Sequence, residues 1–238
     1  MDKIFYAVIV AGGSGTRMGG SVPKQFLPLG GEPILRRTIE RFRKALPEAV
    51  IVTVLPKDSI PMWEEYCLLR FPDCPQMIVE GGITRFHSVR SALAKIPDGA
   101  TVAVHDGVRP FVSEGLIRRM AGLMSSERAL VPVMSVTDTL KNLEKGSSGL
   151  LCELPGPTPD RSRLYAAQTP QMFRSEDLKA AYGRAYDTSF TDDASVVRAA
   201  GIPVSYIEGE KYNIKITTPE DLPLAEFLYG CPTAPSGE

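Results

Sequence analysis

A chain of 238 residues that is 43% hydrophobic and 23% charged is long enough to bury a large globular core. Its formal net charge of -1, from 27 Lys and Arg against 28 Asp and Glu, excludes an overall basic field that would recruit nucleic acid or an anionic membrane. Any bound anion must therefore be held by a local group of cations. The four cysteines have no CxxC spacing and there are two histidines, so neither a zinc site nor a disulfide framework is expected.

The first ten residues, "MDKIFYAVIV", contain a short apolar run and no small-residue cleavage site, so we do not expect a signal peptide. No apolar stretch of the sequence approaches the roughly 20 residues that span a bilayer. These observations predict a cytoplasmic protein without a membrane span.

Short apolar runs rich in Val and Ile alternate with longer amphipathic segments along the chain. Strands are predicted at Ile4–Val10, Val50–Leu55, Met77–Val79, Thr101–Val104 and Ala129–Val133. Helices are predicted at Ile34–Ala45, Met62–Arg70, Ser88–Ile96, Glu114–Ser125, Leu178–Ala185, Asp192–Ala200 and Glu220–Tyr229. Continuous apolar runs are typical of strands that are covered on both faces. Their alternation with helices predicts an α/β fold, with a Rossmann-like, mostly parallel twisted sheet flanked by helices.

The segment 135–164 interrupts this alternation. Within it a glycine-serine turn separates two extended stretches, which predicts a β-hairpin arm that projects from the sheet. A hairpin of this size has little core of its own, so we expect the arm to pack on a second subunit and form a homodimer. A solvent-exposed hairpin is the alternative. The predicted organisation is one domain over residues 1–238, with 135–164 as the arm.

A glycine-rich loop, "VAGGSGTRMGGSVPKQF", begins where the first predicted strand ends. Glycines at the carboxyl end of a strand let backbone N–H groups approach phosphate oxygens closely. The loop is not a Walker A motif, because no Gly-Lys is followed by Ser or Thr, and it is not a dinucleotide fingerprint, because Met18 replaces the third glycine. The residues expected to contact phosphate are Ala11, Gly12, Gly13, Ser14 and Gly15.

Two cations in the same loop are suited to a polyphosphate. Arg17 has a planar guanidinium that matches phosphate oxygens, and Lys24 is a compact point charge held after the stiff Pro23. A simple chain reversal with solvated cations is the alternative.

Six motifs, in order along nearly the whole chain, resemble those of the cytidylyltransferase branch of the sugar-phosphate nucleotidylyltransferases. They are "VAGGSGTRMGGSVPKQF", "GGITRFHSV", "VHDGVRPFV", "AAQTPQMF", "FTDDASVV" and "NIKITTPEDL". The resemblance implies transfer of CMP from CTP to a sugar-alcohol phosphate by a homodimer, with Mg²⁺ bound alongside CTP. "TDDASVV" and "AAQTPQMF" favour 2-C-methyl-D-erythritol 4-phosphate, of non-mevalonate isoprenoid biosynthesis, as the acceptor. Ribitol 5-phosphate is the alternative acceptor, and a non-catalytic nucleotide-binding module is an alternative of another class.

Polar residues gather where "TVAVHDGVRPF" ends. A carboxylate that faces a triphosphate needs a cation or a sugar hydroxyl beside it, so Asp106 either coordinates Mg²⁺ directly or binds the nucleotide in another way. Arg109 is expected to brace the site against Asp106, and His105 is expected to be structural.

"GGITRFHSV" is expected to recognise cytosine, by the same resemblance. Gly81 and Gly82 allow a flat base to approach, and Ser88 supplies a hydroxyl. Ile83 stands where a common form of the motif has an acidic residue, so any contact there must come from the backbone. A plain strand-to-helix turn is the alternative.

Two cations far along the chain are implied to hold the acceptor phosphate. They are Lys215, in the strand-like run "NIKIT", and Arg161, which in the family reaches over from the partner subunit. For Lys215, a side chain that snorkels to solvent is the alternative. For Arg161, the neighbouring Arg163 is the alternative.

Three threonines are candidate hydroxyl donors. Thr139 lies in the arm and Thr191 in "TDDASV", and both are expected on the acceptor side, whereas Thr169 in "QTPQ" is expected to bind the nucleotide. Thr191 is also placed to cap the helix predicted to begin at Asp192.

The implied chemistry needs little covalent work from the protein. A phosphate monoester has a second pKa of about 6, so the acceptor is already largely anionic at neutral pH and needs no general base. Arg17 and Lys24 are therefore expected to act by neutralising charge at the reacting phosphorus.

Overall fold

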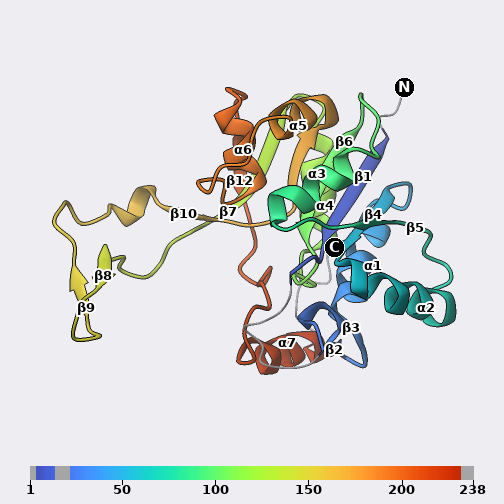
Figure 1. Ribbon diagram of the computed structural model, residues 1–238, viewed down its shortest axis with the longest axis horizontal. Coiled ribbons are helices and arrows are strands. Elements are labelled where there is room, and N and C mark those ends of the chain that lie inside the picture. The colour runs from blue at the N-terminus through green and yellow to red at the C-terminus, as the bar shows by residue number, and fades with distance from the viewer. Residues whose placement is uncertain (1–3, 14–21, 232–238) are drawn as a thin grey trace.

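The computed structural model describes residues 4–13 and 22–231. An eight-stranded, mostly parallel sheet forms its centre, with the strand order β10-β7-β11-β6-β1-β4-β5, and β12 pairs with β7 (Figure 1). Its strands are β1 (Phe5–Val10), β4 (Val50–Leu55), β5 (Gln76–Glu80), β6 (Thr101–Asp106), β7 (Ala129–Ser135), β10 (Tyr165–Ala167), β11 (Gln171–Arg174) and β12 (Ser205–Glu208). This arrangement confirms the predicted α/β fold with a mostly parallel sheet.

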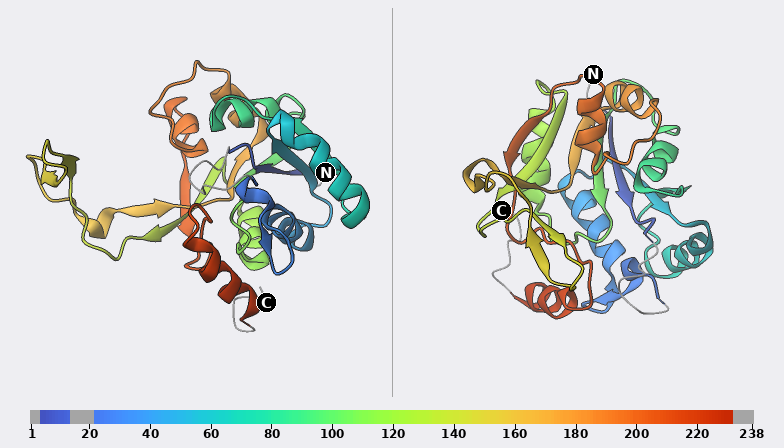
Figure 2. Two further views of the ribbon diagram at one scale, coloured as in Figure 1. Left: turned by 60° about the horizontal axis from the view of Figure 1, so that its bottom comes forward. Right: turned by 60° about the vertical axis from the view of Figure 1, so that its left-hand side comes forward.

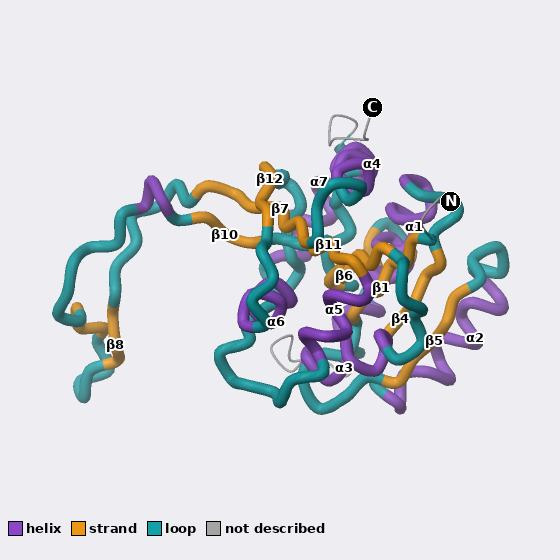
Figure 3. The backbone as a smooth tube through the Cα atoms, turned by 90° about the horizontal axis from the view of Figure 1, so that it is seen from above, coloured by secondary structure: helices purple, strands orange, loops and turns teal. Residues whose placement is uncertain are grey.

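Helices cover both faces of the sheet, because its central strands are apolar on both sides. Val8, Val52 and Val104 pack on one face in a core with α3, α5 and α6, whereas Ile9 and Ile51 pack on the other face with α1, α2 and α4. Figure 3 shows the sheet between α3, α5 and α6 on one side and α1 and α4 on the other. The helices are α1 (Ile34–Ala45), α2 (Ile60–Arg70), α3 (Arg85–Leu93), α4 (Glu114–Leu123), α5 (Ser175–Tyr182) and α6 (Asp193–Ala199).

A smaller third core lies beside the sheet. There α7 (Asp221–Gly230) packs on the small hairpin of β2 (Pro28–Leu29) and β3 (Glu32–Pro33), with Leu29, Ile216 and Leu228 buried between them. Within the described residues, no helix has the length and apolar content that crossing a bilayer requires.

Three loops leave the carboxyl ends of the parallel strands β1, β5 and β6 at the same level. Each donates one more backbone hydrogen bond to its neighbour: Ala11 N–H to Val54 O (2.9 Å), Gly81 N–H to Leu55 O (2.8 Å) and Gly107 N–H to Val10 O (2.9 Å). At Gly107 the backbones are so close that an added Cβ would lie 2.9 Å from the Cβ of Ala11. The loops after β1, β5 and β6 therefore start from one rigid edge.

The segment between β7 and β10 extends away from the sheet (Figures 1 and 2). It contains the expected hairpin, in which β8 (Leu143–Lys145) pairs antiparallel with β9 (Leu151–Glu153). All six of these strand residues are exposed, Leu143 and Leu151 among them. The hairpin therefore has no core of its own in the single chain.

The sequence prediction missed the strands after the arm. β11 lies antiparallel between β6 and β7, β10 is antiparallel to β7, and β12 adds to β7 in parallel. These strands have three or four residues each, and β11 directly follows a proline, so they show neither a long apolar run nor an alternating pattern.

Two local predictions were wrong. The run "NIKIT" is not a strand: Ile216 N–H donates to Val108 O (2.9 Å), which leaves the segment as a loop beside the end of β6. Thr191 does not cap α6, because Asp192 is the N-cap residue and forms a capping box with Ser195. The carboxylate, with no branch at Cβ, is the better acceptor for the first free N–H groups.

Candidate active site

A pocket of about 420 Å³, here called the glycine-loop pocket, opens at the rigid edge formed by the ends of β1 and β6. Its walls come from the loop after β1, the turn into α3, the end of β6 and the loop after β12. The lining residues are Val10, Ala11, Gly12, Gly13, Lys24, Gln25, Gly82, Ile83, Thr84, Arg85, Ser88, Asp106, Val108 and Lys215. Most of the sequence-predicted residues thus meet in one place, whereas Ser14, Gly15 and Arg17 lie outside the described residues.

Gln25 holds the Lys24 segment against the glycine loop. Lys24 begins a short 3-10 helix, and the amide of the next residue, Gln25, donates to Ala11 O (2.9 Å). Gln25 is only 1% exposed, so this bond is shielded from water. A buried neighbour therefore holds the backbone of Lys24 at the pocket wall.

Ser88 clasps the turn that the sequence assigned to base recognition. Its Oγ accepts from Gly82 N–H (3.1 Å) and lies 3.0 Å from Thr84 O, to which it donates. A Cβ added at Gly12 or Gly81 would lie 3.2 or 3.0 Å from this oxygen, so a larger residue at either position would press on the Ser88 hydroxyl. The Ser88 hydroxyl therefore already has a structural role, and the predicted contact with a ligand would use the same group.

The turn itself enters α3 earlier than predicted. Thr84 is the N-cap residue, with Oγ1 accepting from His87 N–H (3.4 Å), so the helix starts at Arg85 and not at Ser88. Ile83 stands beside the cap, is 97% exposed and lines the glycine-loop pocket.

Asp106 is the electrostatic centre of the pocket. Its Oδ2 pairs with Lys215 Nζ at 2.9 Å and with Arg109 Nε at 3.3 Å, and its Oδ1 pairs with Arg85 Nε at 3.4 Å. Burial to 7% exposure would raise the pKa of Asp106, but the charges of Arg85, Lys215 and Arg109 outweigh burial and hold it well below its usual range. The carboxylate is therefore ionised at every physiological pH.

Arg109 braces Asp106, as expected from the sequence. Besides its pairing with the carboxylate, it donates from Nη1 to Asn213 O (2.8 Å), which ties the end of β6 to the loop that carries Lys215. Asn213 in turn donates to Thr169 O (2.8 Å). These hydrogen bonds connect three segments that are distant in sequence, and together they form the base of the site.

His105 and Thr169 form a buried hydrogen-bond network that includes the backbone N–H of Asp106. His105 Nε2 lies 3.0 Å from Arg109 O and Nδ1 lies 3.0 Å from Thr169 Oγ1, which accepts from Asp106 N–H (3.1 Å). Nε2 therefore carries the proton, and the Thr169 hydroxyl donates to Nδ1. Burial lowers the pKa of His105 to about 4, so the imidazole is neutral and structural. The Thr169 hydroxyl is used inside the protein and is not directed at the pocket.

The described side chains do not fit a metal site held by the protein. Among residues 4–13 and 22–231 there is no group of three or more His, Cys, Asp and Glu suited to a metal ion. Asp106 is the carboxylate that lines the glycine-loop pocket, and both of its oxygens are already paired with cations. A divalent cation there would have to displace Lys215 or an arginine.

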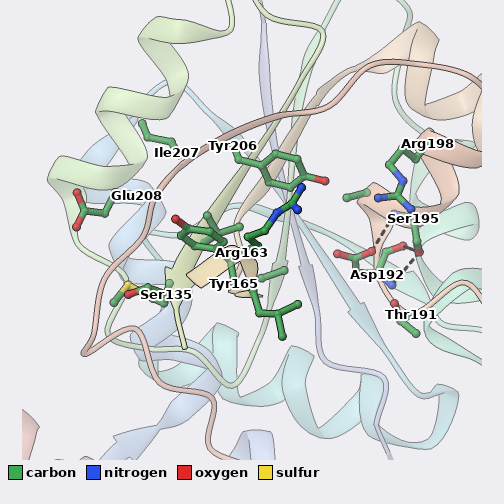
Figure 4. A pocket seen from close by; sticks show the side chains of 15 residues that line it. Ser135, Arg163, Tyr165, Thr191, Asp192, Ser195, Arg198, Tyr206, Ile207 and Glu208 are labelled. Atoms are coloured by element: carbon green, nitrogen blue, oxygen red, sulfur yellow. Dashed lines mark hydrogen bonds between the residues drawn. The ribbon is translucent and has the colours of Figure 1, made fainter. Parts of the chain in front are cut away.

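A second pocket, of about 950 Å³, lies between α6 and the base of the arm and is here called the arm-side pocket (Figure 4). Thr191 and Arg163 both line it, with Tyr165 and Tyr206 on the same side as Arg163. Thr191 is exposed, so its hydroxyl faces solvent beside the start of α6.

Arg161 and Thr139 lie apart from both pockets. Arg161 is exposed and donates from Nη1 to Thr137 O (2.9 Å) within its own arm, and Thr139 is exposed on the same arm. Neither residue lines the glycine-loop pocket of its own chain. The structure therefore does not bring Arg161 together with Lys215 inside one subunit.

Sequence reasoning missed Arg85, which contacts both Asp106 and Asp193 and lines the glycine-loop pocket. A signal for it was present, since a cation directly after a glycine pair and a capping threonine is at the first turn of a helix, where a positive charge is unfavourable. Such a residue needs a compensating carboxylate nearby.

The chain is similar to known proteins along nearly its whole length. Residues 5–230 match the model of the family described as 2-C-methyl-D-erythritol 4-phosphate cytidylyltransferase (IspD). A protein of that name from Bacteroides thetaiotaomicron is 45% identical over 93% of this chain and 97% of its own length, and one from Porphyromonas gingivalis is 44% identical over 96% and 99%. The crystal structure of the protein of that name from Thermus thermophilus is 32% identical, with a TM-score of 0.72 over 95% of this chain and 98% of its own.

Proposed function

The chain belongs to the 2-C-methyl-D-erythritol 4-phosphate cytidylyltransferase family, and from that premise we propose how its residues carry out the reaction. The enzyme transfers CMP from CTP to 2-C-methyl-D-erythritol 4-phosphate in non-mevalonate isoprenoid precursor biosynthesis. The observation that supports this best is the glycine-loop pocket, where Lys24, Lys215 and Asp106 meet beside a glycine-rich strand end.

CTP occupies the glycine-loop pocket. The backbone of Ala11, Gly12 and Gly13, continued by Ser14 and Gly15, holds the triphosphate, and the turn of Gly81 and Gly82 with Ser88 holds the cytosine. Ile83 contributes backbone groups to the base. Thr169 acts on the nucleotide through Asp106, whose N–H it holds, and Arg109 acts by bracing the same carboxylate.

The reaction joins two anions. An oxygen of the acceptor's 4-phosphate attacks the α-phosphorus of CTP, the bond from that phosphorus to the bridging oxygen breaks, and pyrophosphate leaves with the electron pair. Arg17 and Lys24 neutralise the charge that builds on the five-coordinate phosphorus, which preorganised cations do better than water. No side chain has to remove a proton, because the acceptor phosphate is already ionised.

The acceptor lies between Lys215 and the exposed Thr191, with its phosphate held by Arg161 and Thr139 of a second copy of the chain. The separation of Arg161 from Lys215 within one subunit supports a contribution in trans. On this proposal the chain is one nucleotidylyltransferase domain whose residues 135–164 form a dimerisation arm, and the homodimer works in the cytoplasm.

The phosphate oxygens of CTP would hold Mg²⁺, which would neutralise part of the triphosphate's charge. Asp106 is not one of these ligands while Lys215, Arg109 and Arg85 hold its two oxygens. The carboxylate instead sets the positions of those three cations.

A turnover assay tests the proposal. Purified enzyme is incubated with CTP, Mg²⁺ and either 2-C-methyl-D-erythritol 4-phosphate or ribitol 5-phosphate, and pyrophosphate release is measured. Turnover with the first acceptor is expected, with ATP, GTP and UTP as poorer donors and the Lys24→Ala variant as the control for contaminating activity. Turnover with ribitol 5-phosphate alone, or none with either acceptor, would refute the proposed function.

A further inference from the structure

Arg85 occupies an unusual position for a cation. It is the first residue of α3, directly after the Thr84 cap, where the helix dipole disfavours positive charge. Its side chain is nevertheless largely buried, at 29% exposure, and it points across the sheet edge toward two other elements. Something other than helix stability must hold the guanidinium there.

Two carboxylates compensate its charge. Arg85 Nη2 donates to Asp193 Oδ2 at 2.7 Å and Nε lies 3.4 Å from Asp106 Oδ1. Asp193 is fully buried at the first residue of α6, and its other oxygen accepts from the hydroxyl of Tyr182 at 2.5 Å. Tyr182 is itself fixed by stacking on Phe86, with ring centroids 4.6 Å apart.

These contacts join the two halves of the site. The second oxygen of Asp106 pairs with Lys215. Asp193 directly follows Asp192, the N-cap residue of α6, which is preceded by the exposed Thr191. Arg85 is the one described side chain that pairs with both carboxylates. A shift of its guanidinium would therefore move Lys215 and Thr191, both of which face the acceptor.

We propose that Arg85, held by Asp193 and Tyr182, is a positioning residue that fixes Asp106 and the Thr191 segment relative to each other and so aligns the acceptor with CTP. This rests on the proposed function, because it assigns the acceptor to Lys215 and Thr191. The planar guanidinium suits the role, since its fork reaches two carboxylates at once whereas a lysine ammonium on one stem reaches one of them.

Kinetics of four variants test the proposal. Arg85→Gln should raise KM for the sugar phosphate and lower kcat, each on the order of tenfold, as for other residues that orient a functional carboxylate from behind. The Kd for CTP, measured by calorimetry without acceptor, should change by less than about threefold. Arg85→Lys should restore part of the loss. Tyr182→Phe, which keeps the ring, should shift the same constants in the same direction by less, and Lys95→Gln, an exposed change just after the same helix, should shift none.

Amide hydrogen exchange gives a readout that does not depend on the substrate. In Arg85→Gln, exchange should quicken over residues 190–194 and 104–107, while the protection of α1 and α4 stays as in the wild type. If the wild type uses neither acceptor, the proposed function fails while this experiment still reports whether the network exists.

Three results would overturn the inference. The first is unchanged acceptor KM and kcat in Arg85→Gln. The second is a large rise in the Kd for CTP with the acceptor KM unchanged, which would make Arg85 a nucleotide ligand. The third is exchange over 190–194 that is the same in Arg85→Gln and the wild type.

Discussion

Lys215 Nζ lies 2.9 Å from Asp106 Oδ2, although one residue ends a central strand and the other lies in a loop near the far end of the chain. The pair places a cation at the pocket before any substrate is present. Asp106 also pairs with Arg85 and Arg109, so three positive charges surround one buried carboxylate.

Lys24→Ala should lower kcat by roughly two to three powers of ten, because one preorganised electrostatic contact to a transition state has about that effect. Arg17→Ala should act similarly. Steady-state kinetics with saturating CTP and acceptor measure the change, and Lys95→Ala, an exposed lysine after α3, serves as the control. A turnover number equal to that of the wild type in Lys24→Ala would show that this lysine has no role in the transition state.

Lys215→Ala and Arg161→Ala should raise KM for the sugar phosphate more than KM for CTP, since both cations are assigned to the acceptor's phosphate. Lys211→Ala, an exposed lysine just before the same loop, should leave both constants unchanged. Arg163→Ala, measured alongside, decides between the two arginines of the arm. If Lys215→Ala and Arg161→Ala changed only the KM for CTP, the assignment of these cations to the acceptor phosphate would be wrong.

The arm predicts complementation between subunits. If Arg161 acts in trans, a heterodimer of a Lys24→Ala chain and an Arg161→Ala chain has one intact site, so mixed chains should recover about a quarter of the wild-type activity. Each variant alone should stay near its own low level. A protein that elutes only as a monomer in gel filtration at assay concentration, or mixtures with no recovery, would rule out the shared site.

Asp106→Asn should lower kcat while the Mg²⁺ concentration that gives half-maximal activity stays within about twofold of the wild type, because the metal's ligands are assigned to the phosphates. The fall in kcat is expected because Arg85, Arg109 and Lys215 would lose the carboxylate that holds them in position. A Mg²⁺ requirement that rises by about tenfold or more would show that this carboxylate binds the metal after all.

His105 predicts a loss of stability in mild acid. The pKa of the imidazole is about 4 in the folded protein and about 6.5 in an unfolded chain. Between these values the unfolded chain binds a proton that the folded protein does not, so the free energy of unfolding should fall by roughly 3 kcal/mol as the pH is lowered. Above about pH 7 the group should have no effect.

Urea unfolding at about pH 7.5 and about pH 5 measures the part of this loss that is reached by pH 5, about 2 kcal/mol. The chain has two histidines, so His87→Gln is the matched control and should retain the pH dependence. His105→Gln should lose most of it, with a lower stability at both pH values from the broken bonds to Thr169 and Arg109. Equal pH dependence in His105→Gln and the wild type would contradict the assignment.

The central sheet and most of the pocket could be predicted from the sequence because they depend on local signals. A long apolar strand that ends in glycine, or in His105 and Asp106, marks a strand end, and parallel strand ends meet at one edge. That reasoning brings Lys24 and Asp106 to one edge, and both line the glycine-loop pocket. Gly82 and Ser88 line the same pocket, but they were expected there from the resemblance to the cytidylyltransferases.

The rest depends on contacts that leave no local pattern. The antiparallel insertion of β11 is decided by its pairing partners and not by its own short sequence. Arg85 carried a local signal, a cation in the first turn of a helix, but its two carboxylate partners on β6 and α6 could not be identified from the sequence. Thr191 and Asp192 both suit a cap, and packing at the start of α6 selected the second.

The contact between Gly107 and Ala11 restricts how this site can change over generations. A side chain at position 107 would meet the Ala11 Cβ at 2.9 Å, and even beside a glycine at position 11 it would remain 3.2 Å from the Val10 carbonyl oxygen. A residue larger than glycine at position 107 therefore requires both a smaller residue at position 11 and a shift of the Val10 backbone, so substitutions at the two positions are coupled. In laboratory selections for new acceptors, the substitutions that improve activity should therefore lie elsewhere in the pocket loops, while positions 11 and 107 keep small residues.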